Sequence, residues 1–357
     1  MRFNETPIRT AKNFNINNIK LENIEIPEAI TTFENITIIG DTSKINIEQN
    51  ADNTNTDLVY GLSNELTNQV KHGANQKIKL NINNTQNKKE KTEAEIDFKF
   101  DDEKSVLIDN IEITANENTK STVIIKYTSN QESENYHNGI IKAKARKNSE
   151  LNIVVVNLMN TKSNNFLAIE NNFEENAKIN YTIVDFGGKH SITNYYSNLQ
   201  GDNCDNQLNT IYLGKENQIF DLNYIGELRG KKSNIDIEVQ GALKDTSKKH
   251  FKGTIDFKKG CKKATGNENE ACMLLSDTAK SIALPMLLCS EEEVEGNHSS
   301  SAGKIGEKEL FYIMSRGFEL KEAMKLMVRA RFNQILEKIE KEELKNQIID
   351  EIEKRID

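Results

Sequence analysis

The residues of this chain best suited to hold a metal ion lie in a short stretch near its C-terminal end. His298 follows the acidic run Glu291–Glu293 by five to seven residues. A neutral imidazole is a common metal ligand, and carboxylates such as those of Glu292 and Glu293 could add hard oxygen ligands. Two plainer interpretations stay open: the histidine could only hydrogen-bond a loop carbonyl, and the charge run could only be a solvated surface.

The cysteines form no recognisable framework. The four, Cys204, Cys261, Cys272 and Cys289, contain no C-x-x-C pair, which argues against a zinc site and a disulfide scaffold. Cys261 has lysines beside it that would lower its thiol pKa, so it is a weak candidate for a redox or cluster role. We expect Cys272 and Cys289 to pack in the core and Cys204 to be exposed in a turn. The other histidines, at 72, 137, 190 and 250, are isolated among polar residues and are expected at the surface.

Composition excludes several classes of function. The chain has 47 basic and 55 acidic residues and a net charge of −8, which disfavours a nucleic-acid binder. No Walker sequence occurs, so any ATP hydrolysis must come from a partner. The N-terminal residues lack the apolar segment of a secretory signal, and no apolar run is long enough to span a bilayer. We therefore expect a cytoplasmic protein with reduced thiols and no membrane partner.

The elements that must position these side chains are mostly strands. Between residues 76 and 290 apolar residues alternate with polar ones, as at Ile78, Leu80 and Ile82, and β-rich runs recur every 28–30 residues. Of 47 asparagines, 44 precede residue 270, and asparagine suits tight corners because it tolerates the left-handed conformation. This pattern favours a parallel β-helix over a β-sandwich, with residues 76–305 as its body.

Helical patterns flank this body. Leu58, Leu62, Leu66 and Val70 predict a short helix over residues 57–71, within an otherwise extended arm at 1–75. Residues 306–357 predict a C-terminal helical domain of three helices, 307–317, 320–341 and 343–356. The first helix is expected to turn Leu310, Phe311 and Met314 inward.

Several motifs near the end of the chain resemble one known family. They are Leu274-Leu-Ser-Asp277, Pro285-Met-Leu287, the acidic run, Gly296-Asn-His298, Leu310-Phe-Tyr312 and Ser315-Arg-Gly317. In order and spacing they resemble the SufB/SufD family of iron–sulfur cluster assembly proteins over about 50 residues, with weaker similarity across 75–357. The resemblance implies a right-handed parallel β-helix capped by a C-terminal helical domain, in agreement with the periodicity.

The resemblance also implies a function and partners. SufB and SufD pair through their β-helices, each holds one SufC ATPase with its C-terminal helices, and the complex builds a transient Fe–S cluster. The chain would then be a subunit that is not itself an enzyme. It would pair with a SufB-like paralogue or with itself, and the turn expected at 293–303 would lie near that contact. The residues expected to contact the ATPase are Leu310, Phe311, Arg316, Leu326, Met327 and Ala330, although internal packing is the alternative for most of the second helix. Flavin binding is left open.

The resemblance places the site residues as well. His298 occupies the position of the family's histidine beside the pairing interface, which makes it the first candidate ligand for iron, with Glu292 and Glu293 aligned to the family's acidic pair. Gly296 stands where the family often has cysteine, so the chain looks more like SufD than SufB. The competing hypotheses are a carbohydrate-binding β-helix and a purely structural one. The absence of Trp and of an export signal disfavours the first, and the helical motifs disfavour the second.

Overall fold

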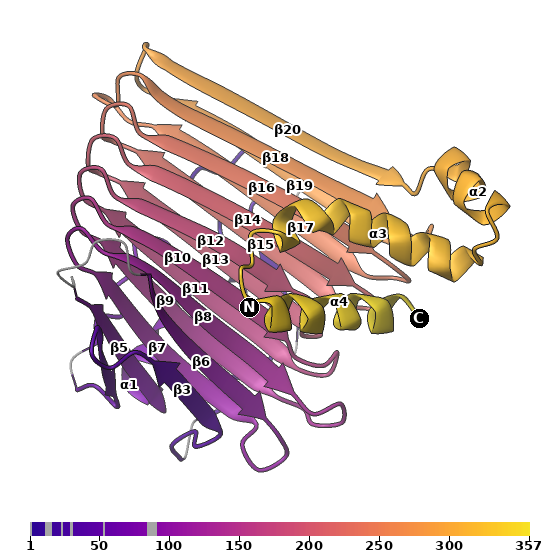
Figure 1. Cartoon of the computed structure of the whole chain (residues 1–357), viewed down its shortest axis with the longest axis horizontal. Coiled ribbons are helices and arrows are strands. Elements are labelled where there is room, and N and C mark those ends of the chain that lie inside the picture. Colours follow the sequence, from indigo (N-terminus) through magenta and orange to yellow (C-terminus); the bar gives the residue numbers. More distant parts are fainter. Residues whose placement is uncertain (1, 11–15, 23, 29–30, 53, 84–90) are drawn as a thin grey trace.

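The chain folds into two parallel sheets stacked as a β-helix of about 8 turns, with helices at its C-terminal end (Figure 1). The computed structural model describes residues 2–10, 16–22, 24–28, 31–52, 54–83 and 91–357. Half of the chain is strand and 15% is helix, which confirms the predicted fold class. None of the helices in these ranges is long and apolar enough to cross a membrane.

From β5 onward, successive strands alternate between two nine-stranded sheets. Sheet I consists of β3 (Ile36–Gly40), β6 (Thr92–Phe100), β8 (Lys120–Ser129), β10 (Glu150–Leu158), β12 (Lys178–Asp185), β14 (Asp205–Gly214), β16 (Asn234–Leu243), β18 (Ala264–Leu274) and β20 (Val294–Lys304). Sheet II consists of β4 (Ile45–Gln49), β5 (Gln76–Ile82), β7 (Val106–Ala115), β9 (Tyr136–Ala145), β11 (Asn164–Phe173), β13 (His190–Leu199), β15 (Ile219–Leu228), β17 (Lys248–Phe257) and β19 (Lys280–Cys289). All neighbours within each sheet are parallel except the first pair, where β3 and β4 run antiparallel to β6 and β5.

Asparagines build one series of corners of the β-helix, although many others lie within its strands. Asn118, Asn148, Asn176 and Asn203 occupy equivalent corners of successive turns, each with a left-handed φ of 55–58°. Their side chains form a ladder, in which each amide nitrogen donates to the amide oxygen of the preceding asparagine over 3.3, 2.9 and 3.2 Å. For these four residues the prediction of asparagine corners is confirmed, because each one both adopts the unusual backbone conformation and links adjacent turns.

The N-terminal arm and one short helix cover the outer face of sheet II. Helix α1 (Asn64–Gly73) begins after Ser63, whose side chain accepts a hydrogen bond from the backbone N–H of Leu66 at 3.2 Å. The helix predicted over 57–71 is therefore wrong in its first half, because this N-cap fixes the start at residue 64. Near the chain start, where β1 (Arg2–Phe3) pairs with β2 (Ile19–Lys20), Asn4 is buried and donates to the Asp221 carboxylate at 2.7 Å.

Three helices follow the β-helix, and the last two of them pack on the outer face of sheet I. The three are α2 (Glu307–Ser315), α3 (Leu320–Leu336) and α4 (Glu342–Ile356). Phe332 of α3 and Ile352 of α4 belong to one buried apolar cluster with Val184 and Phe186 of the β-helix. The Phe186 and Phe332 rings lie 6.2 Å apart. This shared core fixes α3 and α4 against the strands.

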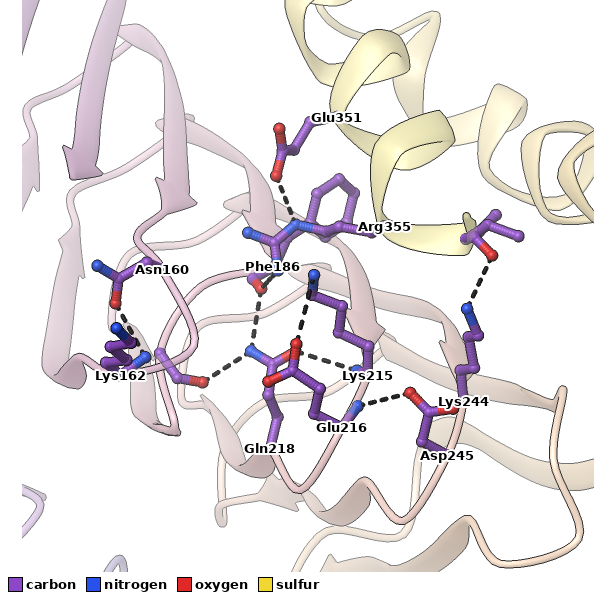
Figure 2. A network of polar contacts seen from close by, with 12 residues as sticks. Asn160, Lys162, Phe186, Lys215, Glu216, Gln218, Lys244, Asp245, Glu351 and Arg355 are labelled. Carbon is purple, nitrogen blue, oxygen red and sulfur yellow. Dashed lines mark hydrogen bonds and ion pairs between the residues drawn. The ribbon is translucent and has the colours of Figure 1, made fainter. Parts of the chain in front are cut away.

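Polar contacts lock the end of α4 to the corners beneath it, as Figure 2 shows. The buried Arg355 guanidinium donates to the carbonyl oxygens of Phe186 and Met159, and Nε donates to the Glu351 carboxylate at 2.8 Å. Lys244 Nζ, from a neighbouring corner, donates to the carbonyl oxygen of Ile356 at 2.8 Å. The last helix is thereby held in one orientation on the β-helix.

We expect Asn176→Ala to lower the free energy of unfolding by about 1–2 kcal/mol, because alanine both resists the left-handed conformation and breaks the ladder. Asn176→Gly is the matched control. It keeps the conformation and loses only the side-chain bonds, so its loss should be clearly smaller. Urea denaturation followed by circular dichroism measures both, and equal losses in the two variants would contradict the conformational role of the corner.

Candidate functional site

The candidate site lies at the C-terminal end of the β-helix, where the two sheets stop at open edges. β20 is the last strand of sheet I and β19 is the last strand of sheet II. Figure 1 shows β20 along the outer border of the sheet, with no described element beyond it. The stretch 293–303 was expected to be a turn. That expectation is wrong, because Val294–Lys304 pair in parallel register with β18 over the whole strand.

The edge of β20 presents unpaired backbone groups. At the two ends of its pairing with β18, the Glu293 carbonyl accepts from Lys263 N–H and Ile305 N–H donates to the Leu274 carbonyl. Both residues are odd-numbered, and the backbone groups of a strand alternate in direction from one residue to the next. The N–H and C=O groups of Gly296, His298, Ser300 and Ala302 therefore point away from β18, toward the open side.

The even-numbered side chains of β20 face the interior of the β-helix. A Cβ atom on Gly296 would lie 3.0 Å from the ring of Phe257 in the core. Ser300 Oγ donates to the Glu270 carboxylate of β18 at 2.8 Å. His298 is in register with Glu268, so its imidazole also lies on the interior side. It is exposed because no further turn covers it.

Directly beneath His298 lies a carboxylate that the sequence did not reveal as a site residue. Glu268 is only 2% exposed, and neither of its oxygens has a hydrogen-bond partner among the described residues. Burial, together with the nearby Glu270 carboxylate, raises the pKa of Glu268 to about 8. Its side chain extends toward Gly253 of β17, where an added Cβ would lie 2.1 Å from a carboxylate oxygen.

A second buried carboxylate two residues along the strand is fully partnered. Glu270 forms an ion pair with Lys249 Nζ at 2.7 Å, and both side chains are completely buried. Tyr212 donates its hydroxyl to the same carboxylate oxygen of Glu270 at 3.1 Å. The interior of the last turns therefore holds two carboxylates and one buried ammonium group, and that ammonium is committed to Glu270.

The other predicted metal ligands lie elsewhere. Glu292 and Glu293 are exposed in the corner before β20, where Glu293 pairs with Lys262 at 3.6 Å. At about 3.3 Å per residue they are roughly 15–20 Å from His298 along the strand. The structure therefore does not bring them together with His298. Nor do the described residues contain any group of three or more His, Cys, Asp and Glu side chains that could hold a metal ion.

The cysteines differ from expectation in three of four positions. Cys261 is fully buried, and burial with the nearby Glu291 raises its thiol pKa to about 11, so the predicted lowering by neighbouring lysines is wrong. Cys204 is also buried, and Cys289 is exposed at the end of the edge strand β19, opposite to both predictions. Cys272 is buried as predicted.

One histidine was also misplaced by the sequence. His137, expected at the surface, is completely buried inside the β-helix. Its Nε2 lies 3.1 Å from the Asp109 carboxylate and its Nδ1 lies 2.6 Å from Asn165 Oδ1. This histidine is held by interior partners and is not available at the open end.

The residues expected to contact an ATPase lie on α2 and α3, and most of them are accessible. Phe311 is 74% exposed, and Arg316, Leu326 and Ala330 are exposed too. Leu310 is half-buried, and Met327 is half-buried against the cluster beneath α3. The expectation that Phe311 and Met314 face inward is wrong, because α2 lies beyond the end of β20 next to α3 and has no buried residue (Figure 1).

The buried ion pair gives a test of the interior geometry. Lys249→Met should destabilise the protein by about 3–5 kcal/mol, because it leaves the Glu270 carboxylate buried without a counter-charge. Combining it with Glu270→Gln should recover much of this loss, since the amide is neutral and still accepts from Tyr212. Chemical denaturation of the two single variants and the double variant measures the coupling, and additive losses would contradict a direct pair.

Comparison with known proteins identifies the family. A sequence profile described as "SUF system FeS cluster assembly, SufBD core domain" matches residues 98–331. The iron–sulfur cluster assembly protein SufD of Bacillus subtilis is 27% identical over 180 residues, which cover 50% of this chain and 41% of that protein. A SufBD family protein of Pyrococcus horikoshii is 32% identical over 167 residues, covering 46% and 36%. SufD of Escherichia coli is 21% identical over 241 residues, covering 67% and 57%.

The matched segments thus span less than two thirds of the length of each of these relatives. The profile match, however, runs from β6 through β20 and α2 into α3, and so includes both the open edge and most of the exposed helical surface. The chain belongs to the SufB/SufD family of iron–sulfur cluster assembly proteins.

Proposed function

We propose that the chain is a non-catalytic subunit of an iron–sulfur cluster assembly complex. In this proposal the edge of β20 pairs with a SufB-like paralogue, and α2 with α3 binds a SufC-like ATPase. The observation that carries it is the SufBD core match over 98–331, because the matched region contains both surfaces. Iron and sulfide are the cargo, and the chain contributes shape and interior ligands at the subunit contact.

The open edge supports strand pairing with a partner. β20 has eleven residues and no proline, and its outward backbone groups have no partner within the described chain. Edges of this kind bind other strands unless something covers them. β19 is less suited, because Pro285 lacks an N–H on the side that faces away from β17.

The exposed apolar surface supports binding of a second partner by the helices. Phe311, Tyr312, Met314, Phe318, Leu320 and Leu326 are the large apolar residues exposed on α2, α3 and their connection. Clustered apolar side chains that remain accessible mark protein contacts more often than chance. The sequence contains no Walker motif, so this chain would not itself hydrolyse ATP. In the proposal, a SufC-like ATPase bound to this surface supplies that activity.

Gly296 supports the SufD-like assignment. Its position faces the interior beside Phe257 and Leu287, where a cysteine side chain would lie against apolar groups at the open end. This chain offers no thiolate there, so its contribution to the cargo comes from His298 and from neighbouring carboxylates. A transient cluster would then take its thiolates from the paralogue.

The carbohydrate alternative has little support in the structure. Its stacking platforms would be exposed aromatic rings on the β-helix. In the described residues the large aromatic side chains that are exposed, Phe311, Tyr312 and Phe318, all belong to the C-terminal helical region. A purely structural β-helix would not need this surface.

The helical surface can be tested directly. Phe311→Glu should weaken binding to a SufC-like ATPase about tenfold or more, because it places a charge in the centre of an apolar contact. Ile39→Glu is the matched control, since Ile39 is 62% exposed at the opposite end of the β-helix. Calorimetric titration with the purified ATPase measures both variants, and equal affinities would contradict the assignment of this surface.

The strand edge can be tested by removing one outward N–H. Ala302→Pro should abolish pairing with a SufB-like protein and leave the β18 ladder intact, because the lost N–H points away from β18. Ala302→Ser keeps the N–H and should pair normally. Size-exclusion chromatography with light scattering reports the complex. Pairing of the proline variant with wild-type affinity would contradict the proposed edge, and a dimer of the chain alone would identify a second copy as the occupant.

A further inference from the structure

We propose that Glu268 is a second iron ligand, and that Glu268 and His298 together bind a ferrous ion at the open end of the β-helix. The inference deepens the proposed function and rests on it only in naming iron as the cargo. It concerns a residue of β18 that lies thirty residues before the histidine in sequence and directly beside it in space.

The register of the two strands places both side chains on one side. Glu268 and His298 are Cα partners in the parallel pairing of β18 and β20, whose axes are about 4.8 Å apart. Both project into the interior, as the Glu270–Ser300 hydrogen bond in the same pairing demonstrates. Neighbouring side chains at this separation can bind one ion with bonds of about 2.0–2.2 Å.

Glu268 lacks the partners that buried carboxylates normally have. It is 2% exposed, and it is the only carboxylate in the described ranges whose two oxygens are both buried without a hydrogen bond. A buried polar group without a partner costs free energy unless it has a function or a missing ligand. A cation would satisfy both oxygens.

The charges facing Glu268 also leave room for a cation. Glu270 lies on the same face of β18, and Lys249 from β17 is the nearby ammonium group, already bonded to Glu270. His298 from β20 lies on the same side, Tyr212 donates its hydroxyl to Glu270, and Cys272 is also buried. Glu268 therefore has no cationic partner of its own among the described residues.

The donor set indicates the chemical class of the ion. One carboxylate and one imidazole suit Fe²⁺, Mn²⁺, Co²⁺ and Zn²⁺, whereas a soft copper site would require sulfur ligands. The pair supplies two ligands to the ion. Because His298 is exposed, water or a residue of a partner strand on β20 would fill the remaining coordination positions. The site would hold a ferrous ion loosely in the free subunit and more tightly in the complex.

The test uses the isolated full chain under anaerobic conditions, with Co²⁺ as a spectroscopic probe of the ferrous site. Wild type should bind one Co²⁺ with visible d–d absorption and show a rise in melting temperature. Glu268→Gln and His298→Ala should each weaken binding about tenfold or more. The combined Glu292→Gln and Glu293→Gln variant is the matched control and should bind as wild type.

Two outcomes would overturn the inference: no Co²⁺ binding by folded wild type, or wild-type affinity in Glu268→Gln. Melting without metal shows that each variant is folded, and Glu268→Gln should melt no lower than wild type, because a neutral amide replaces an unpartnered carboxyl group. No partner is present, so failure here leaves ATPase and paralogue binding untouched. Failure of those contacts would likewise leave the Co²⁺ result standing.

Discussion

Each turn of this β-helix is completed only by the turn beyond it. Parallel strands satisfy one another's backbone groups, and inward side chains find their partners on the strands above and below. At the N-terminal end the short antiparallel strands β3 and β4 finish the two sheets. At the C-terminal end the sheets stop at β19 and β20 with their outer edges open. The proposed pairing surface and the proposed iron ligands both follow from this one unfinished turn.

The same constraint distinguishes satisfied interior polar groups from Glu268. In the middle turns, Asp109, His137, Asn165, Ser191 and Asp185 form a continuous line of hydrogen bonds across the strands. Near the end, Glu270 still finds Lys249, Tyr212 and Ser300. Glu268 faces His298 in the last turn and finds no hydrogen-bond partner among the described residues. In our proposal Glu268 is available for a ligand because the stacking ends beside it, and a partner strand would enclose it.

Much of the architecture could be predicted from the sequence because its signals are local. Alternating apolar residues predict strands, and recurring asparagines predict left-handed corners, as Asn118 to Asn203 confirm. β20 was missed because Glu295-Gly-Asn-His-Ser-Ser-Ser301 has little strand preference, and pairing with β18 overrides it. Cys204 and His137 were misplaced because their polar neighbours in sequence point the other way, while their own side chains face the interior. Phe311 was misplaced because helical periodicity alone does not say whether a face meets the body.

Glu268 shows a further limit of sequence reasoning. The sequence does contain a sign of this residue's position. Glu268 is in step with Ala264, Gly266 and Cys272 at alternate positions of the strand, so a charged residue stands where an inward-facing side chain is expected. Which of the alternating residues face inward is certain only once the positions of β17 and β20 beside β18 are known. Ligands thirty residues apart become neighbours through the length of a turn, which no local motif records. The acidic run Glu291–Glu293 is closer to His298 in sequence and farther from it in space.

Hydrogen exchange resolved to single amides of β20 tests the unfinished turn most directly. In the free chain the amides of residues 296, 298, 300 and 302 should exchange fast, while those of 297, 299 and 301 should be protected by β18. Adding a SufB-like partner should protect the even-numbered amides and change the odd-numbered ones little. Even-numbered amides already protected in the free monomer, or still exchanging fast in a stable complex, would contradict the open edge as the point of assembly.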